Sequence, residues 1–419
     1  WYESSWGLNQ GNPTACALFQ GRLWFGGNTK IWASVSDSFE SFDFDIEGNS
    51  APITRTIGFG PVDNVEWIAD SVGLILGIAS DEINVRSTSF GEPLTSTNTN
   101  IISGSSQGVA SISPIKMDDF LIFVQRATVR LMEIGYNSDT ESSVARDIQV
   151  FNRDICIDGI KRIAISRQPE TRIWVLLNTG ELRIYLVDRA ENVYGWSRVT
   201  IDGAIDDIMV LPDSIEDAIY FTIIRDGVIT KRKFSRLCNM VSQHFDGAVL
   251  YTNTASTTLT GLDHLEGETV GVWAEGAALD DETVSSGQIT INATYTAVTV
   301  GLKYTAKWKS GPFLNYRDST VQAERKRIKE IGMTLRDYLP GSIKHGPDFD
   351  TLEDMPSFEE STGKDITGTA VIDTYNELPF SFNGENEKDP RICLQATGPC
   401  SILAVQYSIE GGASDQRPE

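Results

Sequence analysis

Short apolar runs separated by polar turns recur through the first 235 residues with a period of about fifty residues. Each recurrence contains a triplet of large apolar residues, followed eight or nine positions after its start by another apolar residue. A repeat of this length built from strands is typical of a β-propeller. The triplets are Leu23-Trp24-Phe25, Leu74-Ile75-Leu76, Leu121-Ile122-Phe123, Ile173-Trp174-Val175 and Ile219-Tyr220-Phe221, with the partners Ile31, Ile83, Val129, Leu182 and Val228.

Each recurrence contains at least three predicted strands. The triplet strand is continuously apolar, as expected for burial on both faces, whereas the following strand alternates, as in residues 181–185. This combination suits a blade stacked between neighbouring blades, and runs such as 192–197 are candidates for a fourth strand. Another β-rich run begins upstream of each triplet, at Ala15–Ala17, Val65–Trp67, Ser111–Ser113, Ile163–Ile165 and Ile208–Val210.

A series of β-sandwich modules would also place strands every eight to twelve residues, but without the longer period. We therefore predict an all-β chain in which residues 1–245 form a β-propeller, with five blades seen and a sixth left open. The period stops near residue 245, so residues 246–419 are predicted to form a small antiparallel β-barrel or sandwich. Within this second part, residues 338–365 are predicted to be an acidic loop, and a loose tail begins at residue 411.

Charge and hydropathy limit the classes of partner. The 419 residues include 58 acidic and 35 basic residues, for a formal net charge of −23. An acidic field repels nucleic acid, although a solvated surface that maintains solubility explains the same charge. No apolar run approaches eighteen residues, so we expect no membrane insertion. The chain starts at Trp1, which suggests that part of a longer protein is absent.

Catalytic and metal sites have little support in the sequence. The three histidines, at positions 244, 264 and 345, lie in no zinc or catalytic-triad spacing. The paired acids Asp118-Asp119, Asp206-Asp207 and Asp280-Asp281 resemble glycosidase carboxylates only superficially, because neighbours in a strand point to opposite faces. We therefore expect turn and surface roles for them, and no catalytic residues, cofactor or metal.

Several separated segments resemble the tail nozzle, or stabilization (tail tubular), proteins of short-tailed bacteriophages. The first is the opening motif Phe19-Gln20-Gly21-Arg22-Leu23-Trp24-Phe25-Gly26-Gly27, followed by Ile31-Trp32-Ala33-Ser34. Their order and their spread from about residue 6 to residue 410 carry the resemblance. The other segments are Pro93–Thr95, Gln125-Arg126, Ala164–Pro169, Leu262–Val270, Gly287–Thr290 and Val300–Tyr304.

The resemblance implies a noncatalytic virion protein in the viral tail, assembled in the host cytoplasm. It implies a ring, expected to be a homohexamer, below the portal and adaptor and in contact with tail fibres or a needle. During ejection, double-stranded DNA would pass through the lumen without sequence-specific binding. A host-surface glycan-binding or glycan-cleaving tail propeller remains the alternative. An interface or turn role is predicted for Leu262, Asp263, His264, Leu265 and Glu266.

Overall fold

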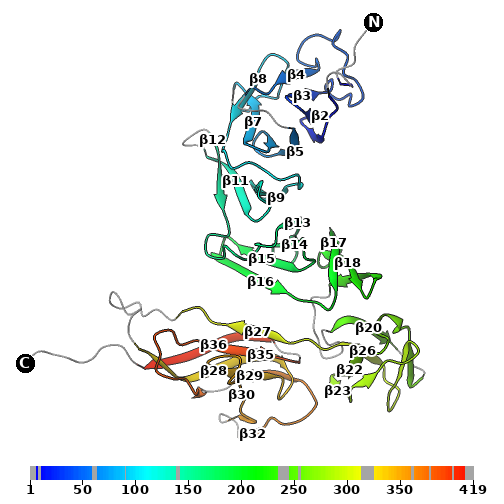
Figure 1. Cartoon of the computed structure of the whole chain (residues 1–419), viewed down its shortest axis with the longest axis vertical. Helices are drawn as coiled ribbons and strands as arrows, with labels where there is room; N and C mark the ends of the chain where they lie inside the picture. Colours follow the sequence, from blue (N-terminus) through cyan, green and yellow to red (C-terminus); the bar gives the residue numbers. More distant parts are fainter. Residues whose placement is uncertain are drawn as a thin grey trace, which may run out of the picture. The chain divides into compact units, whose positions relative to one another are not determined.

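The computed structural model is all-β, as predicted, and begins with a series of antiparallel sheets that resemble propeller blades (Figure 1). The chain divides into two compact units, Trp1–Phe234 and Ser235–Glu419. The structure describes residues 6–7, 11–58, 64–89, 91–137, 142–234, 245–252, 256–312, 325–359, 363–376, 379–398 and 401–410.

The described residues of the first unit form five successive sheets, each built from consecutive strands in sequence order. Four of these sheets have four strands, and the fifth has three. Their strands are β1 (Ala15–Phe19), β2 (Arg22–Gly27), β3 (Lys30–Ala33) and β4 (Ile53–Thr56); β5 (Val65–Asp70), β6 (Leu74–Ile78), β7 (Glu82–Ser87) and β8 (Thr99–Ser103); β9 (Ile115–Met117), β10 (Phe120–Val124), β11 (Leu131–Asn137) and β12 (Ser142–Asp147); β13 (Ile160–Ser166), β14 (Arg172–Leu177), β15 (Leu182–Asp188) and β16 (Val193–Val199); and β17 (Ala204–Leu211), β18 (Ala218–Arg225) and β19 (Val228–Phe234).

The apolar triplets lie in the second strand of every sheet, and they follow one packing rule. At each junction between successive sheets, the middle residue of the earlier triplet packs against the later sheet, and the two outer residues of the later triplet pack against the earlier sheet. Trp174, for example, shares a buried cluster with Ile219 and Phe221 of the fifth sheet. Ile173 and Val175 instead join the cluster that contains Ile122 of the third sheet. Alternation along a strand explains the rule, because successive side chains leave opposite faces.

The same rule holds at the other junctions between neighbouring sheets. Trp24 lies in one cluster with Leu74 and Leu76. Ile75 lies in another cluster with Leu121 and Phe123. The fifty-residue repeat is therefore the sequence signature of sheets that pack face to face in chain order.

Two predicted details of the third sheet are wrong. Residues 111–113 are not a strand, because the first strand of this sheet is β9 at Ile115–Met117. The partner position Val129 lies in the turn before β11, whose first residue is Leu131. Asp118, which has a positive φ of 53°, is one of two residues in the turn between β9 and β10. This tight hairpin places the first strand immediately before the triplet strand.

The described residues of the second unit form two buried cores. One core is formed by the strands β20 (Asp246–Thr252), β22 (Thr269–Ala274) and β26 (Ala297–Leu302), together with a short pair of strands. The other lies between two sheets centred on β28 (Arg327–Tyr338) and β35 (Cys393–Ala396). The remaining strands are β21 (Thr258–Thr260), β23 (Ala277–Ala278), β24 (Glu282–Thr283), β25 (Gln288–Thr290), β27 (Ala306–Lys309), β29 (Ile343–Gly346), β30 (Glu353–Asp354), β31 (Phe358–Glu359), β32 (Lys364–Asp365), β33 (Ile372–Asn376), β34 (Phe380–Ser381) and β36 (Ser401–Glu410).

The segment predicted as an acidic loop, residues 338–365, contains the four short strands β29 to β32. Ile343 in β29 is fully buried in the core that contains β28, so this segment contributes to packing despite its acidic composition. The predicted tail from residue 411 lies outside the described residues.

Candidate functional site

The first strands of neighbouring sheets in the first unit lie next to one another and are joined by hydrogen bonds and ion pairs. Strand β1 contacts β5, and β13 contacts both β9 and β17. Before β1, the Thr14 hydroxyl donates a hydrogen bond of 2.6 Å to the carbonyl of Val65, the first residue of β5. We call these adjoining first strands, β1, β5, β9, β13 and β17, the inner strands.

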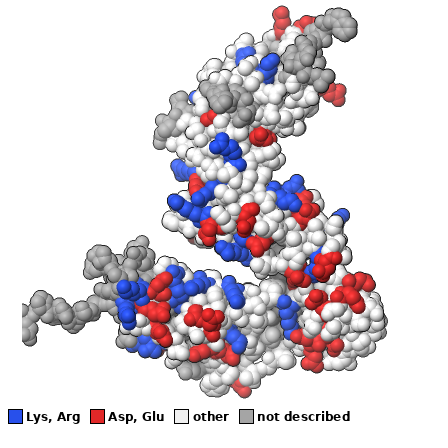
Figure 2. Space-filling model, viewed as in Figure 1, with Lys and Arg blue, Asp and Glu red and all other residues white. Residues whose placement is uncertain are grey.

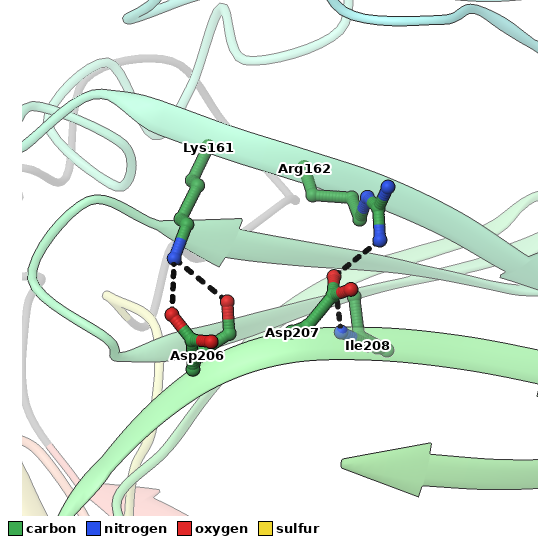
Figure 3. A network of polar contacts seen from close by, with 5 residues as sticks. All are labelled: Lys161, Arg162, Asp206, Asp207 and Ile208. Carbon is green, nitrogen blue, oxygen red and sulfur yellow. Dashed lines mark hydrogen bonds and ion pairs between the residues drawn. The ribbon is translucent and has the colours of Figure 1, made fainter. Parts of the chain in front are cut away.

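Two ion pairs join the inner strands of the fourth and fifth sheets (Figure 3). The Lys161 Nζ donates to the Asp206 carboxylate at 2.8 Å and to its backbone carbonyl at 2.7 Å. Arg162 pairs with the Asp207 carboxylate, which also accepts a hydrogen bond of 2.9 Å from the Ile208 amide. The four charged side chains therefore link β13 directly to β17.

Backbone irregularities place these neighbouring charges on the same side. The pairing register shifts between Ile160 and Arg162 in β13, and between Ile205 and Asp207 in β17. A β-bulge inserts an extra residue and thereby breaks the strict alternation of side chains. Asp206 and Asp207 consequently both contact β13, contrary to the prediction that adjacent acids point apart.

The other inner strands are joined by similar contacts. Lys116 in β9 pairs with Asp70 in β5 at 2.5 Å. Arg167, immediately after β13, donates from Nη2 to the Lys116 carbonyl at 2.6 Å. The backbone amides of Arg167 and Gln168 also donate to the Asp217 carboxylate, at 2.5 and 3.2 Å. At each of these contacts, a charged side chain of one sheet is therefore held by a charged or backbone group of a neighbouring sheet.

This arrangement positions sheets and keeps the local charge balanced. The side chains of the three inner-strand ion pairs are between 44% and 52% exposed, so each pair contributes less than about 1 kcal/mol to stability. Figure 2 shows acidic and basic side chains interspersed on the viewed face of the first unit, whereas acidic side chains predominate at the end of the second unit that contains β20, β22 and β26. The net charge of the chain is therefore not concentrated at the inner strands.

The predicted interface segment 262–266 forms a 3₁₀ turn, Asp263–Leu265, in the second unit. The side chains of Leu262 and Leu265 are buried in the core that contains β22 and β26. A ring nitrogen of His264, Nε2, lies 2.8 Å from the Gly247 carbonyl in β20. These three residues connect the turn to the body of the unit.

Glu266 fastens the same turn to the loop before β25. Its carboxylate accepts hydrogen bonds from the amides of Ser286, at 2.8 Å, and Gly287, at 2.7 Å. These backbone donors, first Gly287 and then Ser286, hold the pKa of Glu266 below its usual value. Gly287 has a φ of +67°, and a Cβ there would lie 2.4 Å from a carboxylate oxygen of Asp263. The motif is therefore built as a turn, and its predicted interface role stays a prediction.

The remaining candidate residues are dispersed. His345 is buried against Phe380 and Phe382, and burial lowers its pKa, whereas His244 lies outside the described residues. Asp118-Asp119 form a turn, and Asp281 pairs with Lys303 in a loop of the second unit.

Within the described part of the chain, no group of three or more His, Cys, Asp or Glu residues is arranged to hold a metal ion. In that same part, no helix has the length and apolar character needed to cross a membrane.

A cavity of about 650 Å³ lies beside strand β7 and was not predicted from the sequence. Arg86 and Tyr136 line it, and the Arg86 guanidinium donates to the Tyr136 hydroxyl at 3.1 Å. Asn84 and Ser143 also line it and are joined by a hydrogen bond of 2.8 Å. These polar residues come from different sheets, so no local motif brings them together in the sequence.

Glu82, the first residue of β7, is a fully buried acid that sequence reasoning also missed. One carboxylate oxygen accepts hydrogen bonds from the Ser105 hydroxyl and the Gln107 amide, whereas its other oxygen has no hydrogen-bond partner. Burial is the main cause that raises its pKa from 4.5 to about 7. The folded chain thus favours the neutral acid.

Replacing Glu82 with Gln is expected to remove a pH-dependent destabilisation. Because the folded state holds the proton more tightly, wild-type stability should fall between pH 4.5 and 7 and then level off. The Glu82→Gln variant should be more stable than wild type at pH 8 by about 3 kcal/mol, and nearly equal at pH 4.5. Urea unfolding at both pH values measures this difference. Glu47→Gln, at an exposed position, is the control, and an equal pH slope in wild type and Glu82→Gln would contradict the assignment.

The sequence matches no protein-family model, and no curated protein is significantly similar to it.

Proposed function

We propose that this chain is a noncatalytic structural protein of a virion. In this proposal it forms the ring-shaped tail nozzle below the portal and adaptor of a short-tailed bacteriophage, as a homohexamer. Its partners are the adaptor and portal complex and the tail fibres or needle. The ring retains the genome and then conducts double-stranded DNA during ejection, without reading its sequence. A fold of this kind serves many functions, so the proposal depends on particular residues.

The observation that carries the proposal is that segments resembling nozzle proteins contact one another. Gln20, in the opening motif, accepts a hydrogen bond of 2.8 Å from the amide of Leu94, in another such segment. In the second unit, the amide of Leu262 donates to the Gly287 carbonyl at 2.9 Å, which joins two further segments. Segments that are distant in sequence and resemble nozzle proteins are thus joined by hydrogen bonds within each unit. This is expected when the shared residues maintain a fold.

The contacts among the inner strands support a role of the first unit in the rigid wall of the proposed ring. Their charged groups are engaged between neighbouring sheets, and apolar clusters join the successive sheets on both faces. A sheet series held in this way resists deformation when a polymer passes. Locally balanced or acidic surfaces also avoid the counterion release that drives tight DNA binding.

The cavity beside β7 favours the alternative function, glycan binding. Its polar lining combines the Arg86 guanidinium, the Tyr136 hydroxyl and the Asn84 amide, and Phe19 and Leu94 add apolar surface. A few polar groups on a partly apolar concave surface are typical of small-ligand sites. This alternative predicts saturable binding of host-surface polysaccharide, which Arg86→Ala would weaken.

Electron microscopy of the purified chain, alone and with the adaptor, distinguishes the two functions. The nozzle proposal predicts closed rings, or rings that form on the adaptor, and no release of reducing sugar from capsular or cell-wall polysaccharide. The Arg86→Ala variant serves as a matched control, because it should still form rings. Monomers that do not bind the adaptor but release reducing sugar would overturn the proposal.

A further inference from the structure

The fifth sheet of the first unit has an apolar face that breaks the packing rule of the other sheets. Tyr220 is the middle residue of its triplet, equivalent to the fully buried Trp174, yet it is 36% exposed. Ile219 and Phe221, on the opposite face, pack against the fourth sheet as the rule requires. The fifth sheet therefore presents, in exposed form, the face that every preceding sheet covers with the next one.

Register defines the residues of this exposed face. Tyr220 pairs with Met209 of β17 on one side and with Lys233 of β19 on the other. Along the same face, Ile224 pairs with Ile229, and Lys231 lies between Ile229 and Lys233. Met209 is 52% exposed and Ile229 is 67% exposed. We call these six residues the basic apolar face: Met209, Tyr220, Ile224, Ile229, Lys231 and Lys233. Lys233 also pairs at 3.5 Å with Asp213, which follows β17, and both side chains of this pair are about half exposed.

A long loop of the first sheet has the opposite charge and a similar apolar content. Residues 34–52 connect β3 to β4 and contain five acidic residues and no basic residue. Phe39 and Phe44 are each 45% exposed, and Ile46 is 37% exposed. The five exposed acids between and beside them are Asp37, Glu40, Asp43, Asp45 and Glu47. We call this segment the acidic aromatic loop.

Arg22 holds the acidic aromatic loop in place. Its guanidinium donates to the carbonyl of Ser34 at 2.6 Å, where the loop begins. It also donates to the carbonyls of Asn49 at 2.6 Å and Ala51 at 2.8 Å, where the loop ends. The side chain is buried, so both loop ends are anchored while Phe39, Phe44 and Ile46 between them stay exposed. Anchoring lowers the entropy cost of binding through the loop.

We infer that the basic apolar face binds the acidic aromatic loop of a second copy of this chain. Lysines on one surface meet carboxylates on the other, and exposed aromatic and aliphatic side chains on both surfaces are buried together. The two surfaces differ, so the contact is head-to-tail and can be repeated from copy to copy until a ring closes. The inference rests on the proposed function for ring closure, and it identifies the residues through which the copies associate.

Charge reversal tests the contact without disturbing the core. In one variant, Lys231→Glu and Lys233→Glu make the face acidic; in the other, Asp43→Lys and Asp45→Lys make the loop basic. Each variant alone sets like charges against each other, so its dissociation constant should rise roughly tenfold or more. An equimolar mixture should assemble again, because each face then meets a loop of opposite charge. Sedimentation velocity at tens of micromolar protein measures all three samples beside wild type.

The outcomes decide between a head-to-tail contact and other kinds of association. Restored assembly in the mixture supports the contact. Phe151→Ser is the control, because Phe151 is 97% exposed and lies outside both surfaces, so this variant should assemble as wild type does. Wild-type protein that stays monomeric, variants that assemble as wild type does, or a mixture that stays dissociated would overturn it. The adaptor is absent from this experiment, so a negative result excludes only the contact between copies. Failure to form rings with the adaptor is a separate result, and that result would overturn the proposed function.

Discussion

Replacing Trp174 with Asp should unfold the first unit or lower its melting temperature by roughly 10 °C or more. Trp174 is fully buried between the fourth and fifth sheets, with edge contacts to Phe221 and Phe234 at ring distances of 6.0 and 5.2 Å. Its indole nitrogen donates to the Ser166 hydroxyl at 2.9 Å. The substitution leaves a cavity, an unpaired hydroxyl and a buried charge, with an expected cost above about 4 kcal/mol. Near-ultraviolet circular dichroism and calorimetry measure the loss.

Tyr220→Asp is the matched control, because it changes the same triplet position in the fifth sheet. Tyr220 is partly exposed, so the new charge stays hydrated, and the expected cost is below about 1 kcal/mol. The comparison is made at protein concentrations at which the chain is monomeric. Equal losses in the two variants would show that the packing rule does not govern stability.

Replacing Arg22 with Met is the second change with a large expected effect. The side chain is 2% exposed, and its guanidinium donates to the carbonyls of Ser34, Asn49 and Ala51. Met fills similar space but donates no hydrogen bond, so several buried carbonyls lose their partner. We expect a loss of about 3 kcal/mol in the free energy of unfolding. Proteolysis within residues 34–52 should also become faster, because both loop ends are released.

Arg22→Lys separates the charge from the geometry. A lysine keeps the positive charge but presents a single ammonium group in place of the planar guanidinium, so it reaches fewer of these carbonyls. Its stability and its rate of loop cleavage should lie between those of wild type and Arg22→Met. If limited proteolysis cleaves residues 34–52 at the same rate in all three proteins, Arg22 does not anchor the loop.

The third sheet illustrates how far a periodic pattern predicts strands. The triplet Leu121-Ile122-Phe123 lies in a central strand, as its continuous apolar run indicates. Residues 111–113 are also predicted to form a strand, but they lie in the connection before β9, where Val109 forms only an isolated bridge to Gln125. Apolar composition alone does not distinguish a strand from a connection that packs beside it, because Val109 and Ala110 in this connection are also buried.

The candidate site depended more strongly on tertiary structure. Opposite charges at Lys161-Arg162 and Asp206-Asp207 are visible in the sequence, but their pairing requires two bulges and the stacking of β13 beside β17. Arg86 and Tyr136 reach one cavity from different sheets, and Glu82 is buried by a connection more than twenty residues later. Neither arrangement leaves a local signal.

The all-β class, the repeated sheets and the central position of the triplets followed from the fifty-residue repeat and the continuously apolar triplets, since a strand buried on both faces has no polar face. The choice of neighbour did not, because it depends on which sheet covers which face. That choice buries Trp174 completely and leaves Tyr220 exposed, although both occupy the same place in the repeat. The chain order therefore specifies a series of sheets, and packing against the next surface decides the environment of each residue.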